Sequence, residues 1–455
     1  MVTISDYLGS SAVENVKKAL AAAREKESFN AVISLIEDRA LERAAKVDSG
    51  EISGRLAGVP FIAKDNFLTL DSETTAASDF LRGFVSPIQA TAIEKLEAEG
   101  AICIGKANLD AFAHGGSTEN SAFGVTKNAQ DNTRVAGGSS GGSAVVVALG
   151  IVPFALGTDT GGSIRQPASF NGVVGIKPTY GTVSRFGVVS MASSTDTIGV
   201  LSSSIEDAEL VMDVMSGKDS RDMTTLPDFL ESSTGKVPKK VAVIKEFMSD
   251  AVDPEVGRAV ESYVENLKSA GVEVGEVSLP MLKYALPTYY IVVPAEISSN
   301  LGRYDGIRYG VRSEEAKTLT DVYGMSREDG FVSENKRRII IGSYVLSSGY
   351  FDAYYLKAQK ARTLLIQDFD KAFEQYDLLI GPVAPDPAYK IGENSGDPVK
   401  MYMADIMTVP ASLAGLPAFS LPVGNTEAGL PVGVQIIGRR KSDADMFAFA
   451  KEFSK

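Results

Sequence analysis

The strongest constraint on the fold of this chain is a repeated succession of amphipathic helices and short apolar runs. Residues 91–100 carry apolar side chains at helical spacing and end in a glycine, and residues 101–105 follow as an apolar run. Residues 240–244, 256–270 and 272–277 repeat this order as strand, helix and strand. A chain that alternates in this way buries its strands in a sheet and packs its helices against them. The sequence therefore predicts an α/β fold.

The same criteria place further elements along the chain. Helical periodicity predicts helices at residues 13–27, 31–47, 144–149, 205–215, most of 334–376, and 443–453. Apolar runs predict strands at residues 58–63, 153–156, 173–176, 378–381, 418–423 and 432–437. Residues 216–238 are polar and rich in helix breakers, so we expect a boundary or a long surface loop there.

Charge and composition exclude several classes of protein. The chain has 455 residues, with 45 Lys and Arg against 58 Asp and Glu, so its net charge is −13 and it has no general attraction for nucleic acid or anionic membranes. No run reaches the roughly 18 apolar residues of a membrane span, and the first residues do not resemble a signal peptide. Cys103 is the only cysteine, which excludes an internal disulfide and a cysteine metal site, and its apolar run predicts a buried thiol. We therefore expect a soluble, cytoplasmic protein without a metal.

Two glycine-rich clusters with serines are the clearest candidates for chemistry. The first, residues 137–144, reads GGSSGGSA and lacks the Lys-Ser/Thr ending of a phosphate loop. Glycines just before a helix allow backbone N–H groups to approach a reacting atom closely. In the second cluster, residues 159–167 (DTGGSIRQP), the N–H groups of Thr160, Gly161 and Gly162 resemble an oxyanion hole, and Ser163 follows as a candidate nucleophile.

A serine nucleophile needs a base, and the chain has a single histidine. That residue, His114, lies in an undistinguished context, so we favour a packing or pocket-lining role for it. A buried lysine is the other candidate, because burial lowers its pKa toward neutrality. Lys64 and Lys177 both follow apolar strands, and the residues alone do not choose between them.

These motifs together resemble the amidase signature family. Lys64 precedes Ser139 by 75 residues, and Ser139 precedes Ser163 by 24, within GGSSGGS and GGSIRQP blocks that have the family's form. The resemblance implies that Ser163 is the nucleophile, that Ser139 relays the proton after a cis peptide bond, and that neutral Lys64 is the terminal base. Ser140 and Ser143 keep structural interpretations as hydroxyls near a helix N-terminus.

The family resemblance also implies an architecture. It predicts an amidase-signature fold with a central mixed β-sheet flanked by helices on both faces. It predicts one domain over residues 1–455, with N-terminal helices to about residue 50, a signature core over about 51–216, and a C-terminal part over about 239–455.

Further motifs resemble one branch of the family, the A subunits of tRNA-dependent amidotransferases. They are STENSAFG, KPTYG, VSRFG, RYDGIRYG, KRRI and LSSGY at residues 117–124, 177–181, 183–187, 303–310, 336–339 and 346–350. The resemblance implies glutamine hydrolysis, with ammonia passed on for amidation of Glu-tRNA(Gln), Asp-tRNA(Asn) or both. It implies a heterotrimer with the B and C subunits, in which the B subunit binds most of the tRNA and uses ATP and Mg, and no cofactor in this chain. The alternatives are a stand-alone amidase for a small amide and an idle scaffold protein of the same complex, and the intact Lys64, Ser139 and Ser163 argue against the scaffold.

The same branch implies a pocket for the amino-acid part of glutamine. By motif, Arg338 holds the α-carboxylate and Asp405 holds the α-amino group, which suits a guanidinium fork and a carboxylate acceptor. Tyr289 is our choice over Tyr290 for an aromatic wall of the pocket. His114 stands where the family pattern has a methionine before Gly115-Gly116.

Overall fold

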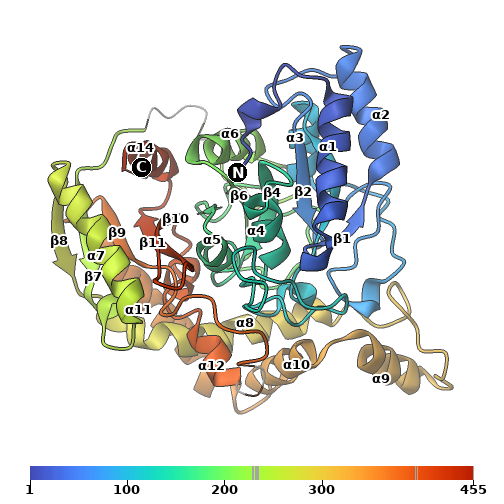
Figure 1. The fold of residues 1–455 in the computed structure, drawn as a ribbon. Helices are drawn as coiled ribbons and strands as arrows, with labels where there is room; N and C mark the ends of the chain where they lie inside the picture. The colour runs from blue at the N-terminus through green and yellow to red at the C-terminus, as the bar shows by residue number, and fades with distance from the viewer. Residues whose placement is uncertain (228–229, 231–234, 395, 397, 454–455) are drawn as a thin grey trace.

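A mixed β-sheet runs through the centre of the molecule (Figure 1). The structure is a computed structural model that describes residues 1–227, 230, 235–394, 396 and 398–453. Its eleven described strands have the order β1-β3-β2-β4-β6-β5-β10-β11-β9-β7-β8. Neighbours are parallel within β3-β2-β4 and β9-β7-β8 and antiparallel elsewhere. The bounds are β1 Val32–Leu35, β2 Pro60–Lys64, β3 Ile102–Ala107, β4 Phe154–Asp159, β5 Val174–Lys177, β6 Thr197–Ser202, β7 Lys240–Ile244, β8 Glu273–Val277, β9 Leu378–Pro382, β10 Ala418–Asn425 and β11 Pro431–Gly438.

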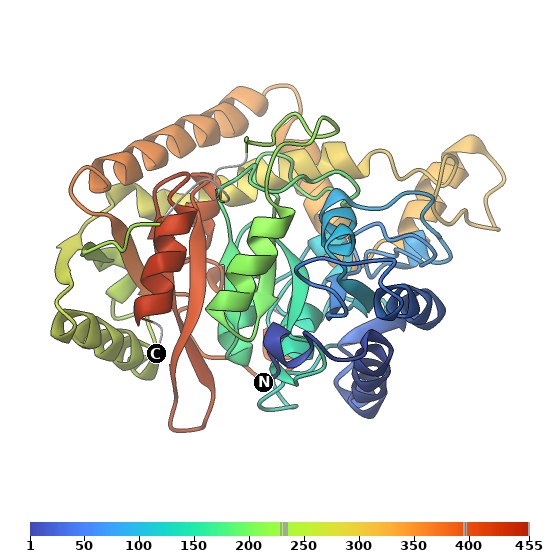
Figure 2. The same ribbon diagram turned by 90° about the horizontal axis from the view of Figure 1, so that it is seen from above.

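Helices cover both faces of this sheet because side chains of a strand point alternately to opposite sides. In β2, Phe61 and Ala63 join one hydrophobic cluster with α3, α6, α7 and α14, whereas Ile62 joins another with α1, α2, α4 and α5. Figure 2 shows α6 and α14 side by side on the first face. The bounds are α1 Ala12–Glu25, α2 Glu37–Asp48, α3 Thr91–Ala98, α4 Gly141–Ala148, α5 Arg165–Asn171, α6 Ile205–Met215, α7 Pro254–Ser269, α8 Ala285–Leu301, α9 Leu319–Gly330, α10 Ser333–Val345, α11 Leu356–Ala372, α12 Pro398–Met403, α13 Val409–Leu413 and α14 Asp443–Phe453.

This arrangement confirms the predicted α/β fold with a mixed central sheet and helices on both faces. β10 pairs directly with β5, so the sheet is continuous across the predicted boundary at residues 216–238. The described residues of that boundary contain no helix or strand, and the rest of it lies outside the described residues. Cys103 is buried in β3, as predicted.

The predicted helix at residues 31–47 is wrong in its first part. Val32–Leu35 form β1, and only Glu37–Asp48 form a helix, α2. The four residues of β1 pair antiparallel with β3, the neighbouring strand. Pairing with a strand that is distant in the sequence overrides a local helical pattern of this length.

Several elements near the site were not predicted or begin elsewhere. The sequence patterns do not indicate the strand β6, the helix α5 or the helix α8, and α4 begins three residues before the expected residue 144. Glycine disfavours helices, which explains the late predicted start of α4. At Gly142, however, a Cβ atom would lie 2.5 Å from the carbonyl oxygens of Ala31 and Asn108, so this tight contact needs glycine.

The sheet brings the lysine and serine motifs of the sequence to the carboxyl ends of two neighbouring strands. β2 ends at Lys64 and its parallel neighbour β4 ends at Asp159, so the two chain segments emerge together. α4 starts immediately after Ser139 and Ser140. Binding sites of α/β proteins commonly lie at the carboxyl ends of parallel strands. Among the described helices, none is long and apolar enough to cross a membrane.

Candidate active site

Lys64 is the centre of a buried cluster of hydroxyl groups. The side chain has no exposed surface, and its Nζ lies 2.8 Å from Ser139 Oγ and 2.9 Å from both Ser140 Oγ and Thr158 Oγ1. Loss of hydration on burial lowers the pKa of Lys64 to about 7, although nearby aspartates favour its charged form. A lysine with this pKa holds a substantial neutral fraction near neutral pH and can accept a proton.

The two glycine-serine clusters meet beside this lysine. The Gly138–Ser139 peptide bond is cis, as the family resemblance implies. The Ser140 N–H donates to the Ser163 carbonyl oxygen at 3.1 Å, which joins the second cluster to the first. Ser163 is 9% exposed, and within the described part of the chain its hydroxyl has no hydrogen-bond partner. The structure thus joins the segment of Ser163, whose hydroxyl is free, to the segment whose Ser139 hydroxyl contacts Lys64.

Asp159 shapes the loop that leads to Ser163. Its carboxylate accepts from the N–H groups of Gly162 at 2.9 Å and Ile164 at 3.2 Å, and it forms a fully buried ion pair with Arg165 at 2.9 Å. This corrects one predicted oxyanion donor, because the Gly162 N–H is already bound. The N–H groups of Gly161 and Ser163 have no acceptor in the described ranges, and neither has that of Thr160, so Thr160 and Gly161 stay predicted oxyanion donors and Ser163 joins them as a candidate.

Close packing explains the glycines of this loop. A Cβ on Gly161 would lie 2.6 Å from the Tyr289 hydroxyl, and one on Gly162 would lie 2.2 Å from Thr408 Oγ1. Gly162 also has a φ of +141°, which favours glycine. Thr408 Oγ1 donates to the Gly161 carbonyl at 2.6 Å, which holds this peptide in place. Tyr289, the tyrosine chosen from the sequence, therefore reaches the same loop as Ser163.

Arg338 and Asp405 come from separate elements of the C-terminal part. Arg338 lies on α10 and is 3% exposed, whereas Asp405 lies between α12 and α13 and is partly buried. The backbone of Gly116 lies between this region and the serine clusters, since a Cβ there would be 3.6 Å from both Asp405 Oδ1 and Gln166 Nε2. Desolvation raises the pKa of Asp405 to about 7, opposed by the Arg338 charge. Arg338 and Asp405, the residues predicted to bind the α-carboxylate and the α-ammonium, therefore lie close enough for their charges to interact.

Lys177 and His114, the other candidate bases from the sequence, have different surroundings from Lys64. Lys177 is fully buried and also has a pKa lowered to about 7 by burial, but its Nζ donates to the carbonyls of Pro178 and Leu416 at 2.9 and 2.6 Å. It makes no hydrogen bond to either serine cluster among the described residues, which favours Lys64. His114 is buried with its Nδ1 2.7 Å from Asn335 Nδ2, a contact that fits the predicted packing role.

Sequence reasoning missed several residues that hold the site together. Thr158 stands directly before the second cluster and Asp159 is its first residue, and an aspartate before a glycine loop is a recognisable signal for backbone capping. Glu334 and Tyr402 contact Arg338 from one turn earlier on α10 and from α12, and no local pattern indicates them. No group of three His, Cys, Asp or Glu suited to a metal ion occurs in the part of the chain that the structure describes.

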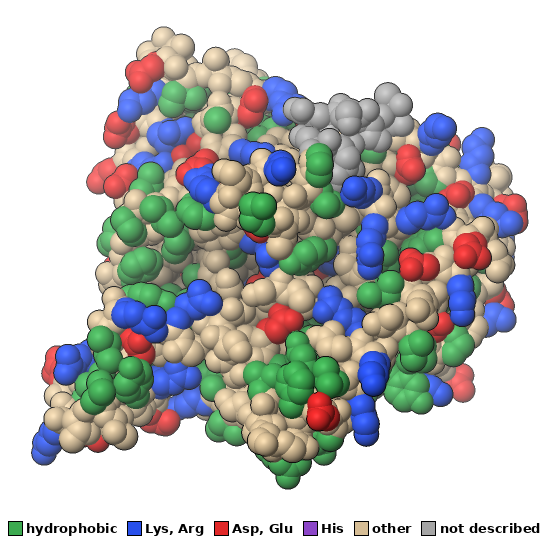
Figure 3. Space-filling model, turned by 180° about the vertical axis from the view of Figure 1, so that it is seen from behind, with side chains coloured by type: hydrophobic (Ala, Val, Ile, Leu, Met, Phe, Trp, Pro, Cys, Tyr) green, Lys and Arg blue, Asp and Glu red, His purple; other side chains and the backbone are tan. Residues whose placement is uncertain are grey.

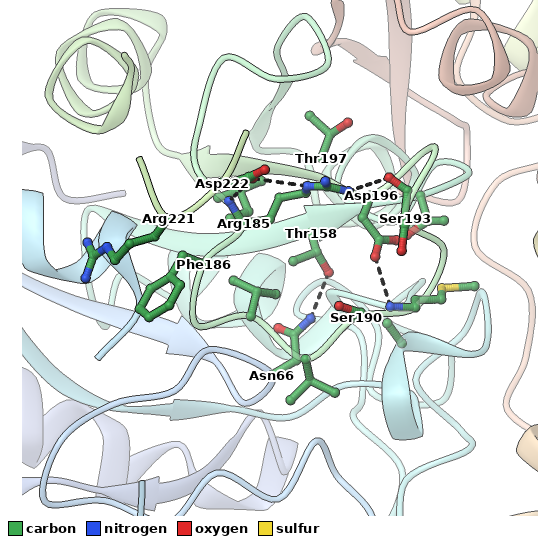
Figure 4. A pocket seen from close by; sticks show the side chains of 16 residues that line it. Asn66, Thr158, Arg185, Phe186, Ser190, Ser193, Asp196, Thr197, Arg221 and Asp222 are labelled. Carbon is green, nitrogen blue, oxygen red and sulfur yellow. Dashed lines mark hydrogen bonds and ion pairs between the residues drawn. The ribbon is translucent and has the colours of Figure 1, made fainter. Parts of the chain in front are cut away.

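A cavity of about 180 Å³ adjoins the lysine cluster, and Asn66, Thr158 and Thr160 line it (Figure 4). Asn66 Nδ2 donates to Thr158 Oγ1 at 3.1 Å, the same hydroxyl that Lys64 contacts. Asp196, on the same wall, accepts from Thr160 Oγ1 at 2.8 Å. The polar wall of the cavity therefore fixes the side chains that flank Lys64 and the oxyanion loop.

The fold and the paired serine clusters define an amidase. A family model described as Amidase matches residues 14–447, and the chain belongs to this family, whose typical chemistry uses a serine, a cis-serine and a lysine.

Within the family, the chain is 51% identical over 431 residues to the A subunit of the glutamyl-tRNA(Gln) amidotransferase of Koribacter versatilis, covering 93% of this chain and 90% of that protein. The solved structure of the corresponding A subunit from Thermotoga maritima is 39% identical with a TM-score of 0.82, over 99% of this chain and 93% of that one. A bacterial aryl acylamidase is 26% identical with a TM-score of 0.85, over 99% and 96% of the two chains.

Proposed function

We propose that this chain is the glutaminase component of a tRNA-dependent amidotransferase. One observation carries the proposal: a buried lysine with a pKa of about 7 lies 2.8 Å from Ser139 Oγ, and the Ser140 N–H joins this cluster to Ser163, whose hydroxyl has no hydrogen-bond partner among the described residues. The much higher identity to amidotransferase A subunits than to an aryl acylamidase supports glutamine over an aryl amide. A stand-alone amidase for a small amide remains the alternative.

In the proposed acylation, Ser163 Oγ attacks the side-chain amide carbon of glutamine. The Ser163 proton passes to Ser139, and the Ser139 proton passes to neutral Lys64. The oxyanion that forms accepts hydrogen bonds from the open N–H groups of Gly161 and Ser163. When the C–N bond breaks, Lys64 returns its proton through Ser139 to the leaving nitrogen, which departs as ammonia. Water then attacks the glutamyl ester with the same proton relay, and glutamate and free Ser163 are released.

In the proposed substrate pocket, the Arg338 guanidinium binds the α-carboxylate and Asp405 accepts from the α-ammonium, with Tyr289 beside the acyl group. Recognition of both charges selects an amino acid over a neutral amide. The ionised form of Asp405 is the one that binds the ammonium, so its raised pKa makes binding depend on pH.

We expect the affinity for glutamine to fall by about tenfold when the pH drops from 8 to 6, because protonated Asp405 no longer pairs with the ammonium. Calorimetry on the Ser163→Ala variant measures this affinity without turnover. Asp405→Asn should bind weakly at pH 8 and show little change with pH. Glutaric acid monoamide, which lacks the ammonium, is the control ligand. An equal pH dependence for this ligand, or for Asp405→Asn, would contradict the assignment.

The B and C subunits of the amidotransferase are the proposed partners, with tRNA, ATP and Mg²⁺ bound mainly by the B subunit in a cytoplasmic assembly. On the face in Figure 3, Lys and Arg side chains are interspersed with Asp and Glu rather than gathered in one basic stripe, which fits tRNA binding by a partner. Tyr344, Tyr350 and Tyr354 are each 40–48% exposed and lie against one another, and exposed aromatic clusters of this kind are typical of interaction surfaces.

The isolated chain is expected to be a poor glutaminase. Co-expression with the B and C subunits should raise kcat/KM for glutamine by roughly 5- to 150-fold, the range of typical coupling between sites. Glutamate release assayed on the chain alone and on the purified assembly measures this ratio. Rapid hydrolysis of glutamine or of general amides by the chain alone would favour the stand-alone amidase.

A further inference from the structure

Arg338 is held along one edge by a buried carboxylate. Glu334 lies one turn earlier on α10, is 2% exposed, and accepts from Arg338 Nε at 2.8 Å. The same carboxylate accepts from the Tyr402 hydroxyl at 3.1 Å and pairs with Arg337. Three donors therefore converge on Glu334, which fixes both its own position and the Nε edge of Arg338.

Two aromatic rings hold the guanidinium from other elements. Tyr290 of α8 and Tyr402 of α12 stack with ring centres 4.0 Å apart. The guanidinium carbon of Arg338 lies 5.4 Å from the Tyr290 ring centre and 5.6 Å from that of Tyr402. Cation–π contacts of this kind restrict the orientation of a guanidinium as well as stabilising it.

The terminal nitrogens of Arg338 are left without a partner. In the described part of the chain, Nε is the only guanidinium nitrogen of Arg338 that donates a hydrogen bond. The two terminal nitrogens therefore present parallel N–H groups, the geometry that binds a carboxylate with two hydrogen bonds. Glu334 occupies the Nε edge of the guanidinium, so a carboxylate ligand must approach the terminal nitrogens.

The clasp formed by Glu334, Tyr290 and Tyr402 also bears on Asp405. Tyr402 lies three residues before Asp405, and the Asp405 N–H donates to the Tyr402 carbonyl at 3.2 Å. The stacking of the Tyr402 ring on Tyr290 anchors the turn that carries Asp405, and Glu334→Gln and Tyr402→Phe both keep this ring, so each should leave Asp405 in place. The positions for a carboxylate and for an ammonium are then held at one spacing.

We propose that Glu334 and Tyr402 are positioning residues that hold Arg338 for a free α-carboxylate, and so set the preference for glutamine over amides that lack this group. The inference rests on the proposed function. An ion pair that only stabilises α10 would affect the hydrolysis of every amide substrate alike. The proposed role affects only the hydrolysis of substrates that carry an α-carboxylate.

The test uses the assembly with the B and C subunits and two substrates, L-glutamine and 4-aminobutanamide, which is glutamine without its carboxylate. Glu334→Gln should raise KM for glutamine about tenfold and Tyr402→Phe about threefold, each with kcat changed less than about twofold. The kcat/KM for 4-aminobutanamide should stay within about twofold. Tyr323→Phe, an exposed tyrosine of α9 to which we assign no role, is the matched control and should leave both substrates unchanged.

A double-variant comparison completes the test. In Arg338→Ala, adding Glu334→Gln or Tyr402→Phe should cause no further loss toward glutamine, because both act through Arg338. Equal losses toward both substrates, or losses that add to those of Arg338→Ala, would overturn the inference while leaving the proposed function intact. A wild-type assembly that hydrolyses no glutamine would overturn the proposed function and the inference with it. If Glu334→Gln fails to fold, Tyr402→Phe still decides the matter.

Discussion

Replacing Ser163 with alanine is expected to lower kcat for glutamine hydrolysis by about 10⁴-fold or more. The hydroxyl is the proposed nucleophile, and no other hydroxyl of the described site combines freedom from hydrogen bonds with open N–H groups beside it. The fold should survive, because within the described residues the Ser163 hydroxyl bonds to nothing and its loss should change the free energy of unfolding by less than about 1 kcal/mol. Steady-state glutamate release and thermal unfolding measure the two quantities. Residual activity near the wild-type level would remove Ser163 from the mechanism.

Replacing Lys64 with methionine is expected to lower kcat/KM by roughly 10²- to 10⁴-fold, the usual contribution of a general base. Methionine has a similar length and no proton acceptor of comparable strength. In the wild type, only neutral Lys64 accepts the serine proton. Because the pKa of Lys64 is lowered to about 7 in the unliganded chain, kcat/KM should rise as the pH increases through about 7 and level off above it. A kcat/KM that falls over this range would contradict the assignment.

Lys177 offers a matched control for this variant. It is equally buried, and its pKa is also lowered to about 7, but its Nζ binds two backbone carbonyls. Lys177→Met should destabilise the fold by about 1–3 kcal/mol for each carbonyl left without a donor, and should keep kcat per folded molecule. Equal catalytic losses in the two variants would indicate a structural effect of burying methionine.

The groups to which we assign the reaction stand out in the sequence because their signals are local. The serines stand within short glycine blocks, and family spacing then selects Lys64. Without that spacing, Lys64 and Lys177 cannot be distinguished, since both end a buried strand and both have a lowered pKa. The two lysines differ in their tertiary neighbours. Hydroxyl groups surround Lys64 and backbone carbonyls surround Lys177, and sequence patterns do not contain that difference.

The fold was predictable for most of the completely buried strands, although the equally buried β6 was missed because Thr197, Gly199 and Ser202 interrupt its apolar run. Completely buried strands such as β2 and β9 are apolar runs in the sequence, whereas the partly exposed β1 has a pattern that favours the start of a helix. The Arg338 clasp was beyond prediction for a different reason. Tyr290, Glu334 and Tyr402 lie on three helices far apart in the chain, and helical periodicity does not indicate which helices meet.

The measurement that tests the central claim most directly is the mass of the enzyme quenched in acid during glutamine turnover. The proposed mechanism predicts a single glutamyl ester, located on the peptide that contains Ser163 and absent from the Ser163→Ala and Lys64→Met variants. A glutamyl adduct on Ser139 or on any other residue, or continued turnover by Ser163→Ala, would contradict it.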